Sequence, residues 1–289
     1  MLISQTFIVA VSGGVDSVVL LHKLMQNKPD QVTYVVAHFD HGIREDSRED
    51  ATFVQTFAKD LQLECVIGEG KLGPQASEEQ ARDARYAFLR QVAHDHQAEK
   101  IIVAHHEDDV LETMVLNMIR GTSPRGLSPM SGQSDILRPL LRSSKQDILQ
   151  YADDHELSWR EDPSNTDEKY LRNYIRKNIT PKLEPARQQL IDINERIDEL
   201  YTDIDIRMNL FLPKKNMLSR SWFVQLPYSV QRELMHAWLV RCNIKDISHQ
   251  MVQRLVVACK TLEPGKKVDV NGQLWLVSQQ QNLLLTSKT

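Results

Sequence analysis

The sequence predicts an α/β fold in which a parallel sheet carries helices on both faces, followed by a helical linker and a small α+β C-terminal domain. Short apolar runs alternate with amphipathic segments in the first half, the periodicity then becomes helical, and a hairpin signal stands near the end. A chain of 289 residues is long enough for two domains. We therefore expect a larger first domain over residues 1–185, a helical linker over 186–212 and a small domain over 213–289.

Apolar runs mark the expected strands of the sheet. Residues 7–11 end in a glycine-rich turn, as a buried parallel strand does, and residues 32–37 and 100–104 form similar runs. Residues 135–141 are the last expected strand. In a sheet of this kind, ligands bind at the carboxyl ends of the strands.

Amphipathic segments between these runs predict the helices that cover the sheet. The first helix carries apolar residues at i, i+3, i+4 and i+7, behind a capping-box-like stretch over residues 47–50: Val54, Phe57, Ala58 and Leu61. The second helix begins at Ser77, with Gln80 three residues on, and carries an apolar face: Ala81, Ala84, Phe88 and Val92.

The second half of the chain is mainly helical in pattern. Apolar residues spaced alternately by three and four predict one long helix with a continuous seam: Leu190, Ile193, Ile197, Leu200 and Ile204. Residues 212–216 indicate a boundary. Beyond it, a further helix is predicted by Leu226, Val230, Leu234 and Trp238. A hairpin is predicted over residues 268–276, because Asn271 and Gly272 can take the positive φ angles of a tight turn.

Composition limits the function classes. A net charge of −4 gives no global indication of a nucleic-acid partner, although one basic face would be enough. The three cysteines stand far apart, which argues against a disulfide framework or a cysteine-rich metal site and fits a reducing compartment. No apolar run approaches the roughly 18–20 residues that cross a bilayer, and the start lacks the features of a secretory signal. We expect a cytoplasmic protein without a membrane partner.

The sharpest chemical signal is a glycine-rich loop between the first strand and a helix. Its six residues are Ser12, Gly13, Gly14, Val15, Asp16 and Ser17. Two glycines let backbone N–H groups face a ligand, and the N-terminus of the next helix favours an anion. For a bare Gly-Gly pair, an ordinary turn with a serine cap is the alternative interpretation. The Walker A pattern is excluded, because no Lys follows the second glycine at the required spacing.

Two further groups of polar residues follow later strands. His38 and Asp40 point to one side of the second strand's end, where they could bind a metal or contact a nucleotide, or simply form a polar strand end. Asp109 and Glu112 are three residues apart on a helix and share its polar face near the first turn. The helix dipole alone favours acids there. Two carboxylates beside a phosphate loop are also what Mg²⁺ requires.

Basic residues form a third group of candidates. Arg82 and Arg85 lie on the predicted helix that starts after Ser77, where a solvated helix face is the alternative interpretation. Residues 169–187 hold six basic residues and one acid, which could form a charged helix face or a stripe for a nucleic-acid backbone.

In order along the chain, these motifs resemble those of a known family. The loop over residues 12–17 resembles the signature of the PP-loop ATP pyrophosphatases, which have a Rossmann-like fold. The ordered set resembles the tRNA(Ile)-lysidine synthetases, and its other members are residues 38–44, 78–86, 105–113, 120–130, 159–165 and 172–176. The sequence departs from the family pattern at Val110, where Gln is usual, and at Ser123, which replaces a glycine.

The resemblance implies a reaction. The enzyme would use ATP and Mg²⁺ to join free lysine to C2 of the wobble cytidine in the CAU anticodon of an isoleucine tRNA, through an adenylated intermediate. Decoding would change from AUG to AUA. The family's longer members carry an additional C-terminal domain for which 289 residues leave no room, so either the chain is a short form or part of the tRNA-binding surface is missing.

The resemblance also implies residue roles. The loop over residues 12–17, with His38, would bind ATP, where Asp16 either grips the pyrophosphate or anchors the loop. The catalytic candidates are Asp40, Asp109, Glu112 and Arg82. Of these, Asp40, Asp109 and Glu112 would hold Mg²⁺ or orient the lysine ammonium. The candidates for contacts to tRNA or substrate are Arg125, Arg172 and Arg176.

Two alternatives stay open. Another PP-loop tRNA-modifying enzyme, such as a thiolase, would typically carry paired cysteines, which this sequence lacks. A catalytically inactive nucleotide- or RNA-binding module is the other alternative, although the phosphate-binding and carboxylate residues are all present. The oligomeric state is not indicated by the sequence.

Overall fold

The fold is taken from a computed structural model. It describes residues 5–42, 47–70, 73, 77–128, 134–161, 171–212, 216–244 and 247–288. The chain divides into two compact units. The first unit comprises Met1–Ile119 and Pro129–Asp192, and the second comprises Arg120–Ser128 and Ile193–Thr289.

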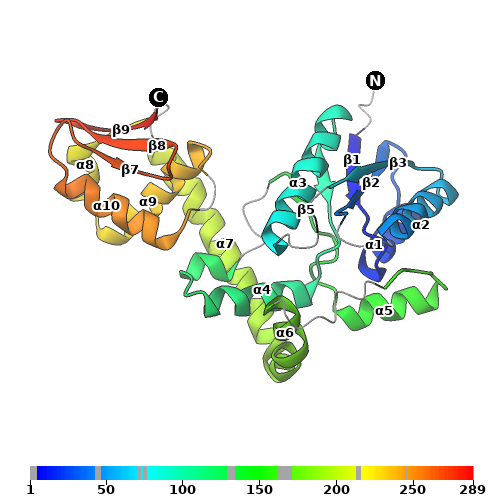
Figure 1. The fold of residues 1–289 in the computed structure, drawn as a ribbon. Coiled ribbons are helices and arrows are strands. Elements are labelled where there is room, and N and C mark those ends of the chain that lie inside the picture. The colour runs from blue at the N-terminus through cyan, green and yellow to red at the C-terminus, as the bar shows by residue number, and fades with distance from the viewer. Residues whose placement is uncertain are drawn as a thin grey trace. The chain divides into compact units, whose positions relative to one another are not determined.

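The first unit contains a parallel five-stranded sheet, as predicted (Figure 1). Its strands are β1 (Gln5–Ala10), β2 (Val32–Asp40), β3 (Glu64–Glu69), β4 (Lys100–Ile102) and β5 (Ile136–Leu137). The strand order is β3-β2-β1-β4-β5, and every pair is parallel. Strand order reverses between β1 and β4, so the loops that follow these two strands meet at the point where such sheets bind ligands.

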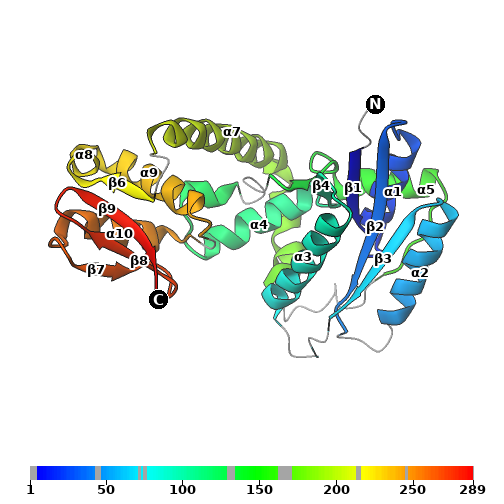
Figure 2. The ribbon, with the colours of Figure 1, turned by 90° about the horizontal axis from the view of Figure 1, so that it is seen from above.

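Helices cover both faces of this sheet, as predicted (Figure 2). They are α1 (Val15–Gln26), α2 (Ser47–Asp60), α3 (Glu78–Asp95) and α5 (Lys145–Asp154). Val9 on β1 packs in one buried cluster with Val54 of α2 and Ile148 of α5, while the next residue, Ile8, packs with Leu89 of α3. Successive strand residues point to opposite faces, and both faces are therefore apolar.

Strand β3 was not predicted from the sequence. Its inner residues, 65–68, are only half-buried, because β3 is an edge strand paired with β2 alone. The capping box at the start of α3 is present, since Ser77 Oγ accepts from the Gln80 backbone N–H while the Gln80 side chain accepts from the Ser77 N–H.

Three further helical segments belong to the first unit. They are α4 (Glu107–Ile119), α6 (Leu171–Asn178) and the start of α7 (Arg187–Phe211), with a 3-10 helix over Thr180–Ala186 between the last two. Helix α4 buries the apolar residues Val110, Leu111, Met114 and Val115. Met118 and Ile119, at the end of the helix, are 49% and 58% exposed.

The long helix predicted from residue 190 onward exists as α7, but its predicted seam is only partly covered, with Leu190, Ile197 and Ile204 half-buried. Ile193 and Leu200 are exposed, whereas Ile191 and Asn194 are buried. Asn194 is buried because its amide donates to the Leu127 carbonyl at 2.6 Å. A polar hydrogen bond, which apolar spacing cannot indicate, therefore fixes which face of α7 is covered.

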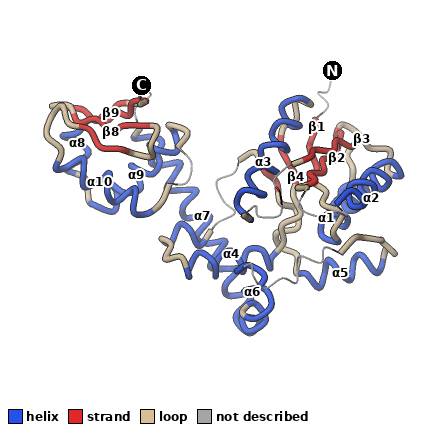
Figure 3. The backbone as a smooth tube through the Cα atoms, in the orientation of Figure 1, coloured by secondary structure: helices blue, strands red, loops and turns tan. Residues whose placement is uncertain are grey.

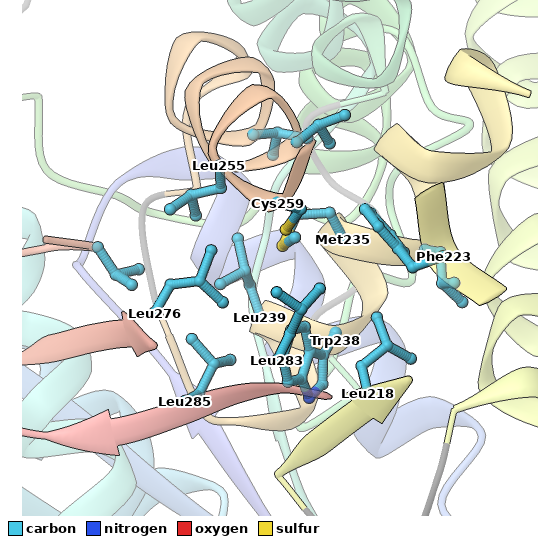
Figure 4. Packing of buried hydrophobic residues seen from close by; sticks show 14 of the residues in the cluster. Leu218, Phe223, Met235, Trp238, Leu239, Leu255, Cys259, Leu276, Leu283 and Leu285 are labelled. Carbon is cyan, nitrogen blue, oxygen red and sulfur yellow. The ribbon is translucent and has the colours of Figure 1, made fainter. Parts of the chain in front are cut away.

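The second unit is α+β, as predicted, with strands and helices in separate layers (Figure 3). Its antiparallel sheet has the order β6-β9-β8-β7, and the strands are β6 (Met217–Ser219), β7 (Lys267–Asp269), β8 (Leu274–Ser278) and β9 (Asn282–Ser287). Its short helices are α8 (Arg220–Gln225), α9 (Tyr228–Arg241) and α10 (His249–Thr261). Trp238 of α9, Leu255 of α10 and Leu283 of β9 meet in its core (Figure 4).

The predicted hairpin joins β7 to β8, but only one of its two turn residues takes a positive φ angle. Gly272 has φ +83°, whereas Asn271 does not enter this region. Asn271 instead accepts hydrogen bonds on its side chain from the Gln273 and Leu274 backbone N–H groups.

None of the described helices is long and apolar enough to cross a membrane.

Candidate active site

The glycine-rich loop lies between β1 and α1 and is organised by a buried serine. Ser17 Oγ accepts from the backbone N–H groups of Ser12 and Gly13, both at 3.2 Å, and donates to the Gly14 carbonyl at 2.9 Å. Gly13 has φ +96°, a conformation that residues with a Cβ rarely adopt. Ser17 is 3% exposed, so in this state its hydroxyl shapes the loop.

The first turn of α1 offers unpaired donors. The backbone N–H groups of Val15 and Asp16 have no hydrogen-bond acceptor among the described residues. A Cβ at Gly14 would meet only Ser12 Oγ, at 3.6 Å, so the space beside these donors is open. Unpaired amides at the positive end of a helix dipole are suited to binding an anion, and the assignment of ATP binding to this loop stays a prediction.

Asp16 is anchored from another part of the sheet edge. Its Oδ1 accepts from Lys145 Nζ at 2.5 Å, at the start of α5. His106 Nε2 lies 3.8 Å from the same oxygen. These contacts favour the anchoring role for Asp16 over direct grip of a pyrophosphate. Lys145 was missed from the sequence, because 129 positions separate it from Asp16.

His106 links the loop to the acidic helix α4. Its Nδ1 accepts from the Asp108 backbone N–H at 3.3 Å, so the neutral ring carries its proton on Nε2. That Nε2 lies 3.8 Å from Asp16 and 3.7 Å from Asp109, and thus faces both carboxylates. The adjacent His105-His106 pair was visible in the sequence, but only three-dimensional packing identifies His106 as the residue between them.

Asp109 is ionised and held in place. Its Oδ2 accepts from the His106 backbone N–H at 3.0 Å. Burial on its own would raise the pKa of Asp109, but His106 and His105, together with that hydrogen bond, lower it overall. A fixed carboxylate next to an anion-binding loop can orient a cationic group beside a phosphate.

Glu112 shares a face of α4 with Asp109, since both carboxylates approach Arg176, but this face is covered at Glu112. The helix begins at Glu107, which puts Glu112 in its second turn, and the side chain is 0% exposed. Its carboxylate accepts from Arg176 Nε at 2.5 Å and Nη2 at 3.0 Å, and Arg172 Nε lies 3.4 Å away. Burial raises the pKa of Glu112, although Arg176 opposes the shift. The covering helix α6 is what buries it.

Arg187, the last of the six basic residues in the stretch 169–187, holds the first turn of α4. Its Nε donates to Glu107 at 3.1 Å and its Nη2 donates to Asp108. Three of the four acids of α4 are therefore paired with arginines at hydrogen-bonding distance. Asp109 is the exception, since Arg176 approaches it only to 3.8 Å.

His38 and Asp40 have local partners at the end of β2. His38 is 4% exposed and its Nδ1 bonds the Val11 carbonyl at 2.9 Å, which fixes the start of the glycine-rich loop. Asp40 accepts from the Gly42 backbone N–H at 2.8 Å and so caps the turn. Residues 43 and 44 of this motif lie outside the described residues.

The remaining arginine candidates have different surroundings. Arg172 Nη2 donates to Thr113 Oγ1 at 2.6 Å, and the Arg82 guanidinium lies 5.3 Å from the Tyr86 ring centroid. Arg125 belongs to the second unit, where Asp205 binds it through two hydrogen bonds of 2.7 and 2.9 Å.

Among the described residues, no three His, Cys, Asp or Glu side chains cluster as a metal site would require.

His105 leads to a pH-dependent prediction. Burial lowers the pKa of His105 to about 3, with Arg138 and Arg85 adding to the shift and Asp109 opposing it. Neutral His105 therefore contributes stability that is complete above the unfolded pKa of 6.5 and is lost as the pH falls toward 3. Between pH 7 and pH 5, we expect wild type to lose about 1–2 kcal/mol more unfolding free energy than His105→Asn. Urea titrations at both pH values test this, and equal losses would contradict it.

Comparison with known proteins agrees with this geometry. A family model of the PP-loop domain matches residues 2–183. The chain is 33% identical over 258 residues to a tRNA(Ile)-lysidine synthase of Bacillus licheniformis, covering 80% of this chain and 54% of that protein. It is 37% identical over 207 residues to a tRNA(Ile)-lysidine synthase of Bacillus subtilis, covering 68% of this chain and 43% of that protein. The chain thus spans about half the length of these relatives.

A solved structure supports the fold alone. The U34-tRNA thiolase NcsA from Methanococcus maripaludis, with its [4Fe-4S] cluster, superposes with a TM-score of 0.59 at 18% identity, covering 68% of this chain and 73% of that one. The resemblance to tRNA(Ile)-lysidine synthetases indicated by the ordered motifs is confirmed by the curated relatives. Because the family match covers more than half of the sequence, the chain belongs to the PP-loop domain family.

Proposed function

We propose that this protein uses ATP to join free lysine to C2 of the wobble cytidine in the CAU anticodon of an isoleucine tRNA, forming lysidine. The proposal rests on the arrangement of the first turn of α1 and Asp109 around His106. His106 Nε2 lies 3.8 Å from Asp16 in that turn and 3.7 Å from the ionised Asp109. The similarity to tRNA(Ile)-lysidine synthases supports the choice of substrates. The reaction would take place in the cytoplasm, where tRNA, ATP and lysine are present.

The proposed reaction has two steps. The C2 oxygen of the cytosine attacks the α-phosphate of ATP, which breaks the bond to the β-phosphate and releases pyrophosphate. The lysine ε-amine, after losing a proton, attacks C2, and AMP leaves with the former C2 oxygen. The amides of Val15 and Asp16 stabilise charge on the leaving pyrophosphate, while Asp109 orients the lysine ammonium before it loses its proton. The target base has to leave the anticodon stack to reach the pocket.

Of the three residues predicted to hold Mg²⁺, which are Asp40, Asp109 and Glu112, Asp109 is the best suited. Mg²⁺ is usually held by one or two carboxylates together with substrate phosphates, and when bound it neutralises phosphate charge. Asp109 meets this need, since it is ionised and lies 3.7 Å from His106 Nε2, which in turn lies 3.8 Å from Asp16 of the glycine-rich loop. Glu112 fits poorly, because its carboxylate is already bonded twice to Arg176. One carboxylate oxygen of Asp40 already accepts a hydrogen bond from the Gly42 backbone N–H.

The second unit and the basic helix α6 are proposed to act on tRNA. Lys177 and the partly exposed Arg176 lie on α6, beside the carboxylates of α4. Because Arg176 already binds Glu112, we assign it first to positioning α6 and second to contact with RNA. Arg125 is assigned to positioning the segment 120–128 within the second unit, through Asp205.

A thiolase activity is the second candidate, and the cysteines argue against it. Sulfur transfer needs accessible thiolates. Burial raises the pKa of Cys65 to about 11 and that of Cys259 to about 12, and it also raises the pKa of Cys242. All three thiols would therefore be protonated at neutral pH.

An assay with labelled lysine distinguishes lysine ligation from a thiolase activity. The protein is incubated with ATP, Mg²⁺, labelled lysine and either of two tRNA transcripts, one with the CAU anticodon and one with its wobble C changed to U. We expect ATP-dependent label in the first transcript only. Label in both transcripts would refute the proposed target base, and label in neither would refute the proposed reaction for this chain.

A further inference from the structure

A carboxylate lies inside the turn that is proposed to bind the pyrophosphate end of ATP. Asp16 is the second residue of α1, and its own backbone N–H is one of the two unpaired donors of that turn. The helix dipole favours an anion at this position, so the Asp16 carboxylate competes with a phosphate for the same positive end. Its negative charge also repels a phosphate at close range. Anion binding here therefore requires a nearby positive charge that offsets Asp16.

The glycine-rich loop carries no cation of its own. None of residues 12–17 is a lysine or an arginine. Loops of the Walker A type include a lysine that reaches the phosphates. In this chain the positive charge has to come from another segment.

Lys145 of α5 supplies a positive charge at this place. Its Nζ lies 2.5 Å from Asp16 Oδ1, and the two side chains are 36% and 30% exposed. In the described part of the chain, Asp16 is the only carboxylate with which Lys145 forms an ion pair. Both groups are thus partly shielded from water, which strengthens the attraction between them.

The position of Lys145 within its own helix is electrostatically unfavourable. Lys145 is the first residue of α5, directly after the N-cap residue Ser144. A cation at a helix N-terminus is opposed by the helix dipole. The acid that suits this turn is Asp147, which completes a capping box with Ser144. Pairing with Asp16, and not the local needs of α5, therefore accounts for a lysine at position 145.

Two other basic side chains near Asp16 are less able to offset its charge. His106 Nε2 lies 3.8 Å from Asp16 Oδ1, farther away than Lys145 Nζ. Burial lowers the pKa of Arg176, whereas hydrogen bonding to Glu112 raises it and Asp16 adds to the rise. Arg176 is therefore within electrostatic range of Asp16, but its hydrogen bonds go to Glu112.

We propose that Lys145 is a positioning residue for ATP, which offsets the charge of Asp16 and thereby allows the first turn of α1 to accept the pyrophosphate. Lys145 acts through Asp16 and does not itself touch ATP. The segment that carries it also joins the first turns of α1 and α4, because the Glu107 backbone N–H donates to the Ser143 carbonyl at 3.1 Å. This inference rests on the proposed function, because the ligand is the ATP of the adenylation step.

Lys145→Met tests this charge balance. We expect the dissociation constant for ATP, measured by calorimetry in the presence of Mg²⁺, to rise about tenfold, because Asp16 then repels the phosphates without a counter-charge. Lys145→Arg keeps the positive charge and should bind ATP within about threefold of wild type. Unchanged ATP affinity in a folded Lys145→Met protein would overturn the proposal.

The double variant Asp16→Asn/Lys145→Met separates action through Asp16 from direct contact with a phosphate. With both charges removed the repulsion is gone, so ATP affinity should return to within about threefold of wild type. A lysine that contacts the phosphate directly would not be replaced in this way. A double variant that binds ATP as weakly as Lys145→Met, while its unfolding midpoint shows it to be folded, therefore contradicts the proposal.

Asp16→Asn alone completes the cycle. It leaves the positive charge of Lys145 in place and removes the competing carboxylate, so ATP should bind at least as tightly as it does to wild type. Weaker binding would mean that Asp16 itself holds the pyrophosphate end of ATP, and the role assigned to Lys145 would then be wrong.

Lys23→Met is the matched control for the same pair of helices. Lys23 lies in the last turn of α1, where its Nζ is 4.4 Å from the centroid of the Tyr151 ring of α5. It thus links α1 to α5 as Lys145 does, but at the other end of α1. Its loss should leave ATP affinity within about twofold of wild type. Equal weakening by Lys23→Met and Lys145→Met would reduce the effect to general charge or helix packing and overturn the assignment.

The calorimetry needs neither tRNA nor lysine, so the two proposals can fail separately. A wild-type protein that binds ATP in a Lys145-dependent way but transfers no lysine would refute the proposed function and leave the role of Lys145 standing. Normal lysine transfer together with unchanged ATP affinity in Lys145→Met would do the reverse.

Discussion

Replacing Asp109 by Asn is expected to reduce lysine transfer to tRNA by at least about 100-fold while the protein stays folded. The amide oxygen can still accept the His106 backbone N–H, which now lies 3.0 Å from Oδ2, so the local hydrogen bond survives. What disappears is the negative charge, which the neighbouring histidines favour by lowering the pKa of Asp109. Labelled-lysine incorporation and thermal unfolding measure the two effects separately.

Asp108→Asn is the matched comparison, because Asp108 is the preceding residue on the same helix. Asp108 is bonded to Arg187 and anchors α4 to the start of α7. Its loss should lower the unfolding midpoint and leave lysine transfer within a few-fold of wild type, the opposite pattern to Asp109→Asn. Near-normal transfer by Asp109→Asn would remove Asp109 from the catalytic set.

The step at which Asp109→Asn fails identifies its role. In the proposed reaction, adenylation of the tRNA releases pyrophosphate before lysine is needed, so this step can be followed without lysine. If Asp109 orients the lysine ammonium, pyrophosphate release should persist in the variant while transfer stops. If Asp109 instead supports metal binding at the phosphates, both steps should be lost together.

The parts of the fold that depend on local pattern could be predicted from the sequence. The alternation of apolar runs with amphipathic segments predicted the parallel sheet with helices on both faces, because burial on two faces requires that pattern. Ser77 with Gln80 marked the start of α3, since a capping box involves only residues three apart. The edge strand β3 was missed because its half-buried residues lack a strong apolar signal.

The electrostatic pairing of the site could not be predicted, because it depends on side chains far apart in sequence. Asp109 and Glu112 appeared equivalent at a spacing of three, yet Arg176 of α6 is hydrogen-bonded to Glu112, whereas Asp109 lies beside His106. Arg176 reaches Glu112 across 64 positions, and Lys145 reaches Asp16 across 129. Helical spacing says which residues share a face, but not which segment packs on that face.

Gly14→Val should abolish measurable ATP binding without unfolding the protein. Gly14 has φ −73° and ψ 160°, a conformation that a valine adopts readily. A Cβ there would meet only Ser12 Oγ, at 3.6 Å, so the folded protein accommodates it. The added side chain would instead fill the space beside the unpaired amides of Val15 and Asp16, where the phosphates must approach. We expect ATP affinity in calorimetry to fall by about 100-fold or more.

Gly13→Ala separates loss of the binding space from strain in the loop. Gly13 has φ +96°, so any side chain there strains the backbone and should cost roughly 1–2 kcal/mol of unfolding free energy. Gly14→Val, by contrast, should keep a near-wild-type unfolding midpoint and lose the ligand. The two neighbouring glycines then have different functions, one making the turn and the other leaving room for the phosphates. Unchanged ATP affinity in Gly14→Val would show that the nucleotide binds elsewhere.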